Sequence, residues 1–65
     1  MITEIGIVAG EIRHYLDQHG ETLFSELTSG IHQPADLTWM SVGWRAREGH
    51  VVVTKEGNHD RVSLR

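Results

Sequence analysis

The chain has 65 residues, and a chain of this length buries only about 60% of its unfolded surface, which supports one core and one domain over residues 1–65. It contains no cysteine, which excludes disulfide bonds and thiolate metal sites and favours a cytoplasmic location. The formal net charge of −3 counts against strong nonspecific binding to a phosphate backbone. No segment has the composition of a signal peptide or of a membrane-spanning helix, so we expect a soluble protein.

The first predicted helix covers about residues 4–19. Thr3 is its candidate N-cap, and Gly20 is expected to end it, because glycine readily adopts the left-handed conformation found after helix ends. Gly6 and Gly10 share one face of this helix and predict the close approach of a neighbouring element. The core face of the helix is indicated by apolar residues at helical spacing: Ile5, Val8, Ala9, Ile12 and Leu16.

A second, shorter helix is predicted in the following segment. Thr22 is its candidate N-cap, and Gly30 is expected to close it after about two turns. Ile31 stands between polar residues and is expected to fill the core beneath the next turn. The apolar positions of this helix are Leu23, Phe24 and Leu27.

A third helix is predicted between a proline and a glycine. Pro34 fits the first helical position, where its missing N–H costs nothing, and Asp36 in the first turn suits the helix dipole. Gly49 is expected to mark the end of this helix.

The remainder of the chain has the pattern of a β-hairpin. Residues 51–54 are β-branched, which favours a strand, and an alternating pattern resumes over residues 61–64. The turn is predicted near Gly57 and Asn58. Three helices followed by a two-stranded hairpin give an α+β fold of order α-α-α-β-β, the order of a winged helix-turn-helix domain.

Local motifs strengthen this prediction. Ser25, Glu26 and Leu27 in the second helix, and an Arg-Glu-Gly sequence before the first strand, resemble winged-helix proteins. A further set of residues lies near the start of the chain and at the end of the third helix: Ile5, Gly6, Ala9, Gly10, Ile12, Gly43, Trp44, Ala46, Arg47, Glu48 and Gly49. Through these residues the chain resembles, over nearly its whole length, the small bacterial winged helix-turn-helix proteins catalogued as a domain of unknown function. This resemblance implies the architecture and favours DNA binding.

The function favoured by this architecture is that of a DNA-binding regulator. The first 33 residues carry five carboxylates against one arginine, whereas the cations gather in the second half. We therefore predict that the third helix and the hairpin contact double-stranded DNA as a dimer, since base edges and phosphates are read by polar and cationic side chains. The candidate contacts are Thr38, Ser41, Arg45, Arg47, Lys55, Asn58 and Arg61.

The orientation of the third helix stays open, because both of its faces contain apolar residues. If Trp44 lies in the core, the outward residues are Thr38, Trp39, Val42 and Arg45. If Val42 and Ala46 lie in the core, they are Leu37, Met40, Trp44 and Arg47. Either both tryptophans anchor the core, or an exposed Trp39 or Trp44 beside an arginine forms an interaction hot spot. The second case predicts a protein partner or a homodimer that does not bind DNA.

Catalytic and metal-binding motifs are missing from the sequence. The five histidines have no i, i+4 pairing and no cysteine nearby, and no glycine-rich phosphate loop or nucleophile motif is present. So short a chain also leaves little room for a substrate pocket. We therefore expect no enzyme activity, metal, cofactor or small-molecule substrate.

Overall fold

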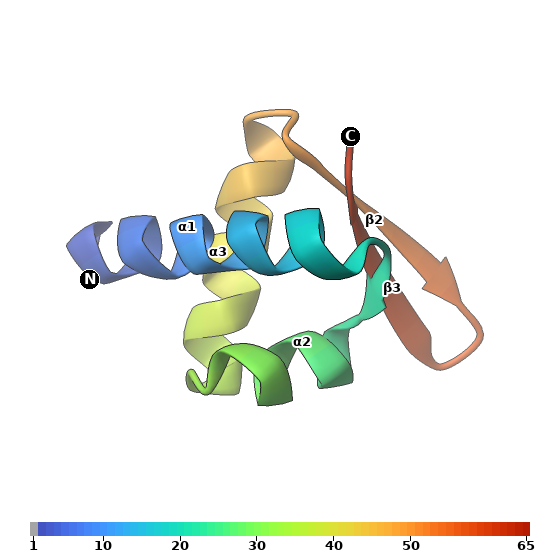
Figure 1. Cartoon of the computed structure of the whole chain (residues 1–65). Helices are drawn as coiled ribbons and strands as arrows, with labels where there is room; N and C mark the ends of the chain where they lie inside the picture. The colour runs from blue at the N-terminus through green and yellow to red at the C-terminus, as the bar shows by residue number, and fades with distance from the viewer. Residues whose placement is uncertain (1) are drawn as a thin grey trace.

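The computed structural model describes residues 2–65 and the side chains of residues 3–65. Three helices are followed by a hairpin, as predicted, and one short strand is added between the first two helices (Figure 1). The elements in chain order are α1 (Ile2–His19), β1 (Thr22–Leu23), α2 (Phe24–Ile31), α3 (Ala35–Arg47), β2 (Val51–Glu56) and β3 (His59–Leu64).

Helix α1 lies across α3, and the two helices pack together (Figure 1). Gly20 ends α1 as predicted, with a φ of 74° and its N–H donating to the carbonyl oxygen of Leu16 at 2.8 Å. The predicted N-cap role of Thr3 is wrong, because the helix already includes Ile2 and Thr3. The predicted close approach at Gly6 and Gly10 is also wrong, since a Cβ at either glycine would meet no described atom within 4 Å other than the nearby backbone of its own helix.

Strand β1 corrects the prediction that Thr22 caps α2. Thr22 is buried and pairs with Val62 of β3, and its hydroxyl donates to the carbonyl oxygen of Gly20 at 2.9 Å. The residue before α2 is instead Leu23, whose N–H donates to the Glu26 carboxylate at 3.3 Å. A two-residue strand has no sequence period, so only its partner strand defines it.

Helix α2 continues beyond the predicted terminator. Gly30 lies inside the helix, and His32 follows it in the left-handed region with a φ of 55°. Gly30 has a packing role, because a Cβ there would overlap the ring of Tyr15 from α1. The glycine therefore permits the contact between the two helices, and a histidine changes the chain direction.

The ends of α3 follow the predicted signals closely. Pro34 immediately precedes the helix, one position before its predicted place, and Asp36 lies in the first turn. After the helix, Gly49 has a φ of 78°, and its N–H donates to the carbonyl oxygen of Ala46 at 3.0 Å. The next N–H, that of His50, donates to the carbonyl oxygen of Arg45 at 2.9 Å. This pair of bonds is a Schellman motif.

The three strands form an antiparallel sheet in the order β1-β3-β2. In the hairpin Val53 pairs with Val62 and Glu56 pairs with His59, so Gly57 and Asn58 form the predicted two-residue turn. Gly57 has a φ of 62°, as the first position of a type II′ turn requires. The start of β2 is joined to α3 by the short turn at Gly49, which fixes the hairpin beside that helix.

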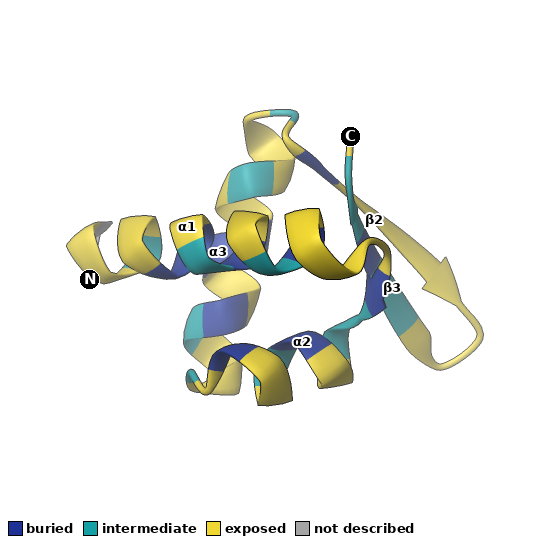
Figure 2. Ribbon diagram, viewed as in Figure 1, coloured by how far each residue is buried: buried dark blue, intermediate teal, exposed yellow. Residues whose placement is uncertain are grey.

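The core lies where α1, α2, α3 and the sheet meet. Buried residues lie along the facing sides of these elements, whereas the tip of the hairpin is exposed on both strands (Figure 2). The buried hydrophobic cluster comprises Val8, Ile12, Leu16, Leu27, Ile31, Val42, Val51 and Val62.

Candidate functional site

The structure settles which face of α3 points outward. Val42 is 1% exposed, whereas Trp44 is 49% exposed and Met40 is 40% exposed. Of the two orientations left open by the sequence, the one with Val42 in the core is therefore correct. It differs in detail, because Ala46 is exposed and Leu37 is half-buried.

Two of the predicted DNA contacts lie on the inner face of α3. Thr38 and Ser41 are fully buried, at 0% exposure. Their hydroxyls donate to carbonyl oxygens of their own helix, Thr38 to Pro34 at 2.9 Å and Ser41 to Leu37 at 2.8 Å. The prediction that these side chains face a ligand is wrong, because small hydroxyl residues bonded within the helix are readily buried.

Arg45 is a structural residue at the contact between α1 and α3. Its Nε donates to the carbonyl oxygen of Ala9 at 3.2 Å, and its Nη1 lies 3.6 Å from the carboxylate of Glu48. The same nitrogen lies 3.2 Å from Nδ1 of His50, and only 18% of the arginine side chain is exposed. The guanidinium is therefore engaged inside the chain, which corrects its predicted placement on a DNA-facing surface.

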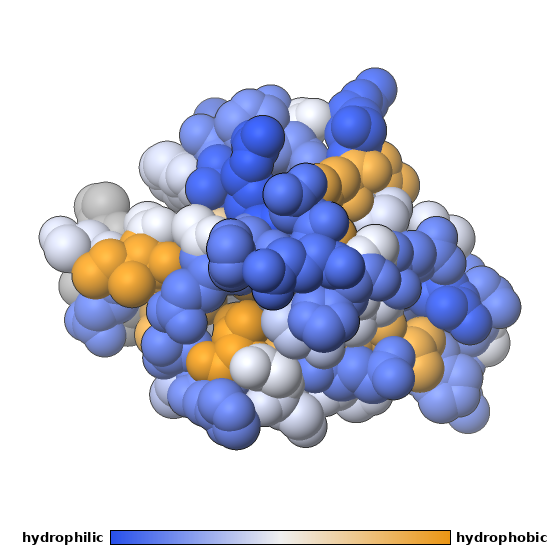
Figure 3. All heavy atoms as spheres, in the orientation of Figure 1, coloured by the Kyte–Doolittle hydropathy of each residue, from blue (hydrophilic) through white to orange (hydrophobic). Residues whose placement is uncertain are grey.

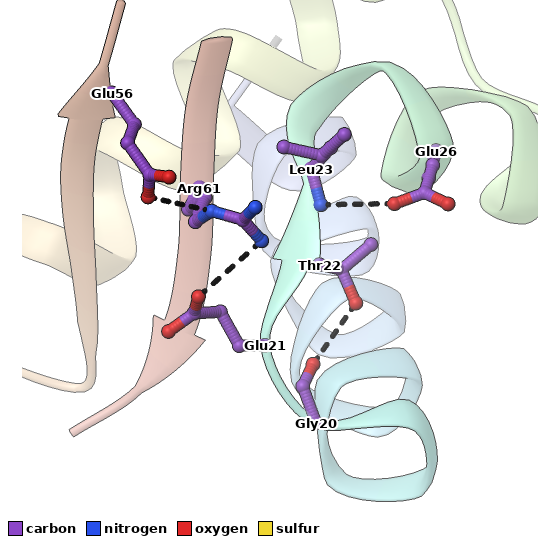
Figure 4. Close-up of polar contacts among 7 residues, drawn as sticks. All are labelled: Gly20, Glu21, Thr22, Leu23, Glu26, Glu56 and Arg61. Carbon is purple, nitrogen blue, oxygen red and sulfur yellow. Dashed lines mark hydrogen bonds and ion pairs between the residues drawn. The ribbon is translucent and has the colours of Figure 1, made fainter.

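The hairpin cations are also paired. Arg61 lies between two carboxylates, with Nε donating to Glu56 at 2.8 Å and Nη1 3.5 Å from Glu21 (Figure 4). This arrangement links β2, β3 and the segment before β1. Lys55 contacts Asp60 at 3.4 Å, and Asn58 is exposed in the turn. The hairpin thus presents compensated charge.

Arg47 differs from these cations. It is exposed, and within residues 2–65 its guanidinium makes no hydrogen bond or ion pair. It borders a surface hollow of about 400 Å³ together with Trp44 and Glu48. Of the predicted DNA contacts on α3, it is the one that the structure places on the outer surface with its charge uncompensated.

The two tryptophans occupy different environments. The Trp39 ring stacks on Phe24 of α2, with centroids 3.9 Å apart and planes 15° apart. Trp44 makes no ring contact among the described residues and is the more exposed of the two. Trp39 therefore contributes to the fold as well as to the surface, whereas Trp44 contributes mainly to the surface.

These residues define a surface that we call the outer face of α3. Gly43 lies in its middle, where a Cβ would meet no described atom within 4 Å other than the nearby backbone of its own helix. The face combines large apolar side chains with a gap at this glycine and one charge near each end. It consists of Asp36, Trp39, Met40, Gly43, Trp44 and Arg47.

A second surface feature is an open groove between α1 and α2. It has a volume of about 740 Å³ and is open to the surroundings along its length. Figure 3 shows apolar surface in the hollow between these helices and over the first turns of α1. Apolar side chains of Ile7, Tyr15 and Ile31 line the groove, and three histidines border it. Its one hydrogen bond between described side chains joins Gln33 to Glu11 at 3.0 Å.

The described residues offer neither a metal-binding cluster nor a membrane-spanning helix. No group of three or more histidine, aspartate and glutamate side chains in this part of the chain is placed to hold a metal ion. Over the same residues, none of the helices combines the length and apolar character needed to cross a membrane.

Helices α2 and α3 joined by a tight turn, with α1 completing the core and a hairpin after α3, define a winged helix-turn-helix domain. Among known families, residues 1–64 match the one described as "Winged helix-turn-helix domain (DUF2582)". The chain belongs to this family. No curated protein matches the chain, and no solved structure matches it.

Proposed function

We propose that this domain is a protein-interaction module that uses the outer face of α3 for contact. The observation that carries the proposal is the exposed Trp44 beside the uncompensated Arg47, on the helix that would otherwise read base edges. Tryptophan and arginine are the residue types most enriched in interface hot spots. The surrounding Met40 and Trp39 extend the apolar area available to a partner.

The charge distribution supports a protein partner more than a nucleic acid. The chain carries a net charge of −3, and the cations of the hairpin are paired with carboxylates. Binding to phosphates would require those pairs to be broken or would rest on few free cations. An apolar surface, in contrast, gains free energy when a partner removes it from water.

Site-specific photo-crosslinking tests the proposal. Trp44 is replaced by p-benzoylphenylalanine, the protein is produced in its own cells, and adducts are identified by mass spectrometry. We expect a discrete protein adduct from position 44 and none from the matched control with the same residue at His59, which is exposed near the hairpin tip. Equal labelling of many proteins from both positions would contradict a specific surface.

DNA binding remains the second candidate, because Arg47, Lys55 and Asn58 are exposed on α3 and the hairpin of a fold that often binds DNA. An NMR titration of the labelled protein with a DNA duplex at low salt distinguishes the two functions. Salt-sensitive shifts in α3 and the hairpin would favour DNA. If no amide moves at low salt, where electrostatic binding is strongest, the protein-interaction function is favoured.

A further inference from the structure

The outer face of α3 has a symmetry in its sequence. Counted from the point between Ser41 and Val42, half a residue from the middle of the helix, its six members form three pairs at equal distances on either side. Asp36 matches Arg47, Met40 matches Gly43, and Trp39 matches Trp44. The first pair is an acid and a base, the second is a long side chain and a residue without one, and the third is two aromatic rings.

From this symmetry we propose that the partner of the outer face is a second copy of this chain, with the two α3 helices antiparallel about a twofold axis at their centres. The proposal rests on the proposed function, because it names the occupant of the same surface. A twofold axis places each residue of one copy level with its matched residue in the other. The acid with its base, and the long side chain with its gap, therefore make the face complementary to its own copy.

The charged pair sets the register of this dimer. Asp36 and Arg47 are eleven positions apart, which is about 16 Å along the helix, and about three turns separate them on nearly the same side. In the antiparallel arrangement, Asp36 faces the second copy's Arg47 at one end, and the reverse pair forms at the other. Arg47 makes no ion pair within residues 2–65, so its guanidinium is free for this contact.

The central pair gives the shape complementarity. Met40 is 40% exposed, and its matched residue Gly43 leaves open space where a side chain would stand. At a helix crossing, a side chain of one helix enters a gap in the facing one. Each methionine would thus fill the gap at the second copy's Gly43, and the backbones could approach closely there.

Contacts within the described residues do not explain Gly43, nor the similarly open Gly6 and Gly10 of α1. A glycine in a helix interior costs about 1 kcal/mol relative to alanine, and a Cβ here would meet no described atom within 4 Å. Asp36 and Arg47, in contrast, each suit the dipole of their own helix, so their positions have a cause within the chain. A gap beside Met40 acquires a role when a second helix is present.

The tryptophans lie on opposite flanks of the face. They are five positions apart, which turns the helix by about 140° between them. In the dimer each flank would carry the same tryptophan from both copies, and the four rings would border the central contact. The Phe24 ring stacked on Trp39 holds that flank in place.

Charge reversal with mixing tests the register. Asp36→Arg and Arg47→Asp are prepared singly, and dimerisation is measured by sedimentation equilibrium. Each variant alone would place like charges opposite each other at both ends, and we expect about tenfold weaker dimerisation. An equimolar mixture of the two variants should regain dimers, because both ends of the mixed dimer carry opposite charges. Arg13→Asp and Asp17→Arg, exposed on α1, are the matched controls and should leave dimerisation unchanged.

Gly43→Ala tests the central contact through two readouts with opposite signs. The alanine should raise the thermal stability of the monomer, since glycine disfavours helices and space is open at this position. It should also weaken dimerisation at least tenfold, because the Cβ occupies the gap that receives Met40. Gly10→Ala on α1, which is open in the same way, should stabilise the monomer without weakening the dimer.

Two outcomes would overturn the inference. If neither the charge reversals nor Gly43→Ala changes the dimerisation affinity, the dimer must use another surface, such as the free edge of β2. A wild-type protein that stays monomeric at millimolar concentration does not pair with itself. In that case the crosslink from position 44 still decides the proposed function, because an adduct with a different protein would retain the outer face of α3 as an interaction surface.

Discussion

The inner and outer faces of α3 reverse the usual relation between polarity and burial. The inner face contains Thr38 and Ser41, both fully buried, whereas the outer face exposes Met40 and two tryptophans. Size and hydrogen bonding explain the inner face, because both hydroxyls donate to carbonyl oxygens of their own helix and leave no polar atom unsatisfied. The outer face has no such internal explanation.

The difference shows that burial on α3 follows from the packing of the helix and not from polarity alone. Arg45, one turn after Ser41, donates to the carbonyl oxygen of Ala9 in α1, so the side of α3 that carries these two residues is the inner one. Large apolar side chains at the fully buried positions 38 and 41 would overpack the interior. Placing them on the opposite face leaves apolar area in water, which is the feature expected of an interaction surface.

The largest expected effect comes from a charge on the inner face. Val42→Asp would bury an unpaired carboxylate in the core cluster, and we expect a loss of roughly 4 kcal/mol or more, enough to unfold a small domain. The collapse of dispersed amide signals in an NMR spectrum measures it. Met40→Asp on the outer face is the control and should remain folded. Equal unfolding of both variants would show that the two faces are alike.

Two helical glycines differ in their surroundings: Gly30 lies against the Tyr15 ring, and Gly6 lies beside open space. Gly30→Ala would drive a Cβ into the Tyr15 ring, and we expect the free energy of unfolding to fall by about 1–3 kcal/mol. Urea denaturation followed by circular dichroism measures the change. Gly6→Ala, which meets open space, should instead stabilise the domain by up to about 1 kcal/mol. A stabilising Gly30→Ala would show that the Tyr15 ring moves aside at little cost.

Alanine substitution of the two tryptophans distinguishes a ring that stabilises the fold from a ring that lies only on the surface. Trp39→Ala removes a ring stacked on Phe24, and we expect a loss of about 1–2 kcal/mol of folding stability. Trp44→Ala should change folding stability by less than about 0.5 kcal/mol. The difference is measured by denaturing both variants at a protein concentration so low that the chains do not associate. A larger loss for Trp44→Ala would place that ring in the fold rather than on the surface.

The smallest expected difference in folding stability is between alanine variants of the two arginines near the end of α3. Arg45→Ala removes the bond to Ala9, and we expect a loss of about 1 kcal/mol. Arg47→Ala should be neutral for folding within about 0.5 kcal/mol, because the charge is uncompensated and exposed. Thermal unfolding of both variants decides the comparison. The opposite order of stability would mean that Arg47, not Arg45, ties the helices together.

Local signals in the sequence predicted most of the fold. Gly20 and Gly49 mark helix ends through their left-handed backbone, and Gly57 with Asn58 forms the hairpin turn, since each of these geometries depends on one or two residues. The candidate site was predicted less well. Arg47, Lys55 and Asn58 lie on the surface as expected, whereas Thr38 and Ser41 are buried and Arg45 and Arg61 are engaged in internal contacts.

The sequence by itself determined the order of the helices and the hairpin, because caps, turns and apolar periods act over a few residues. Only the tertiary structure decided which face of α3 is buried, because both faces carry apolar residues and the choice depends on how the helix packs against α1 and β2. It also decided that Thr22 joins a strand and that Arg61 lies between Glu21 and Glu56. The pairing of Thr22 with Val62 and the contact of Glu21 with Arg61 join residues 40 positions apart (62 − 22 and 61 − 21), and pairing across such distances leaves no period in the sequence.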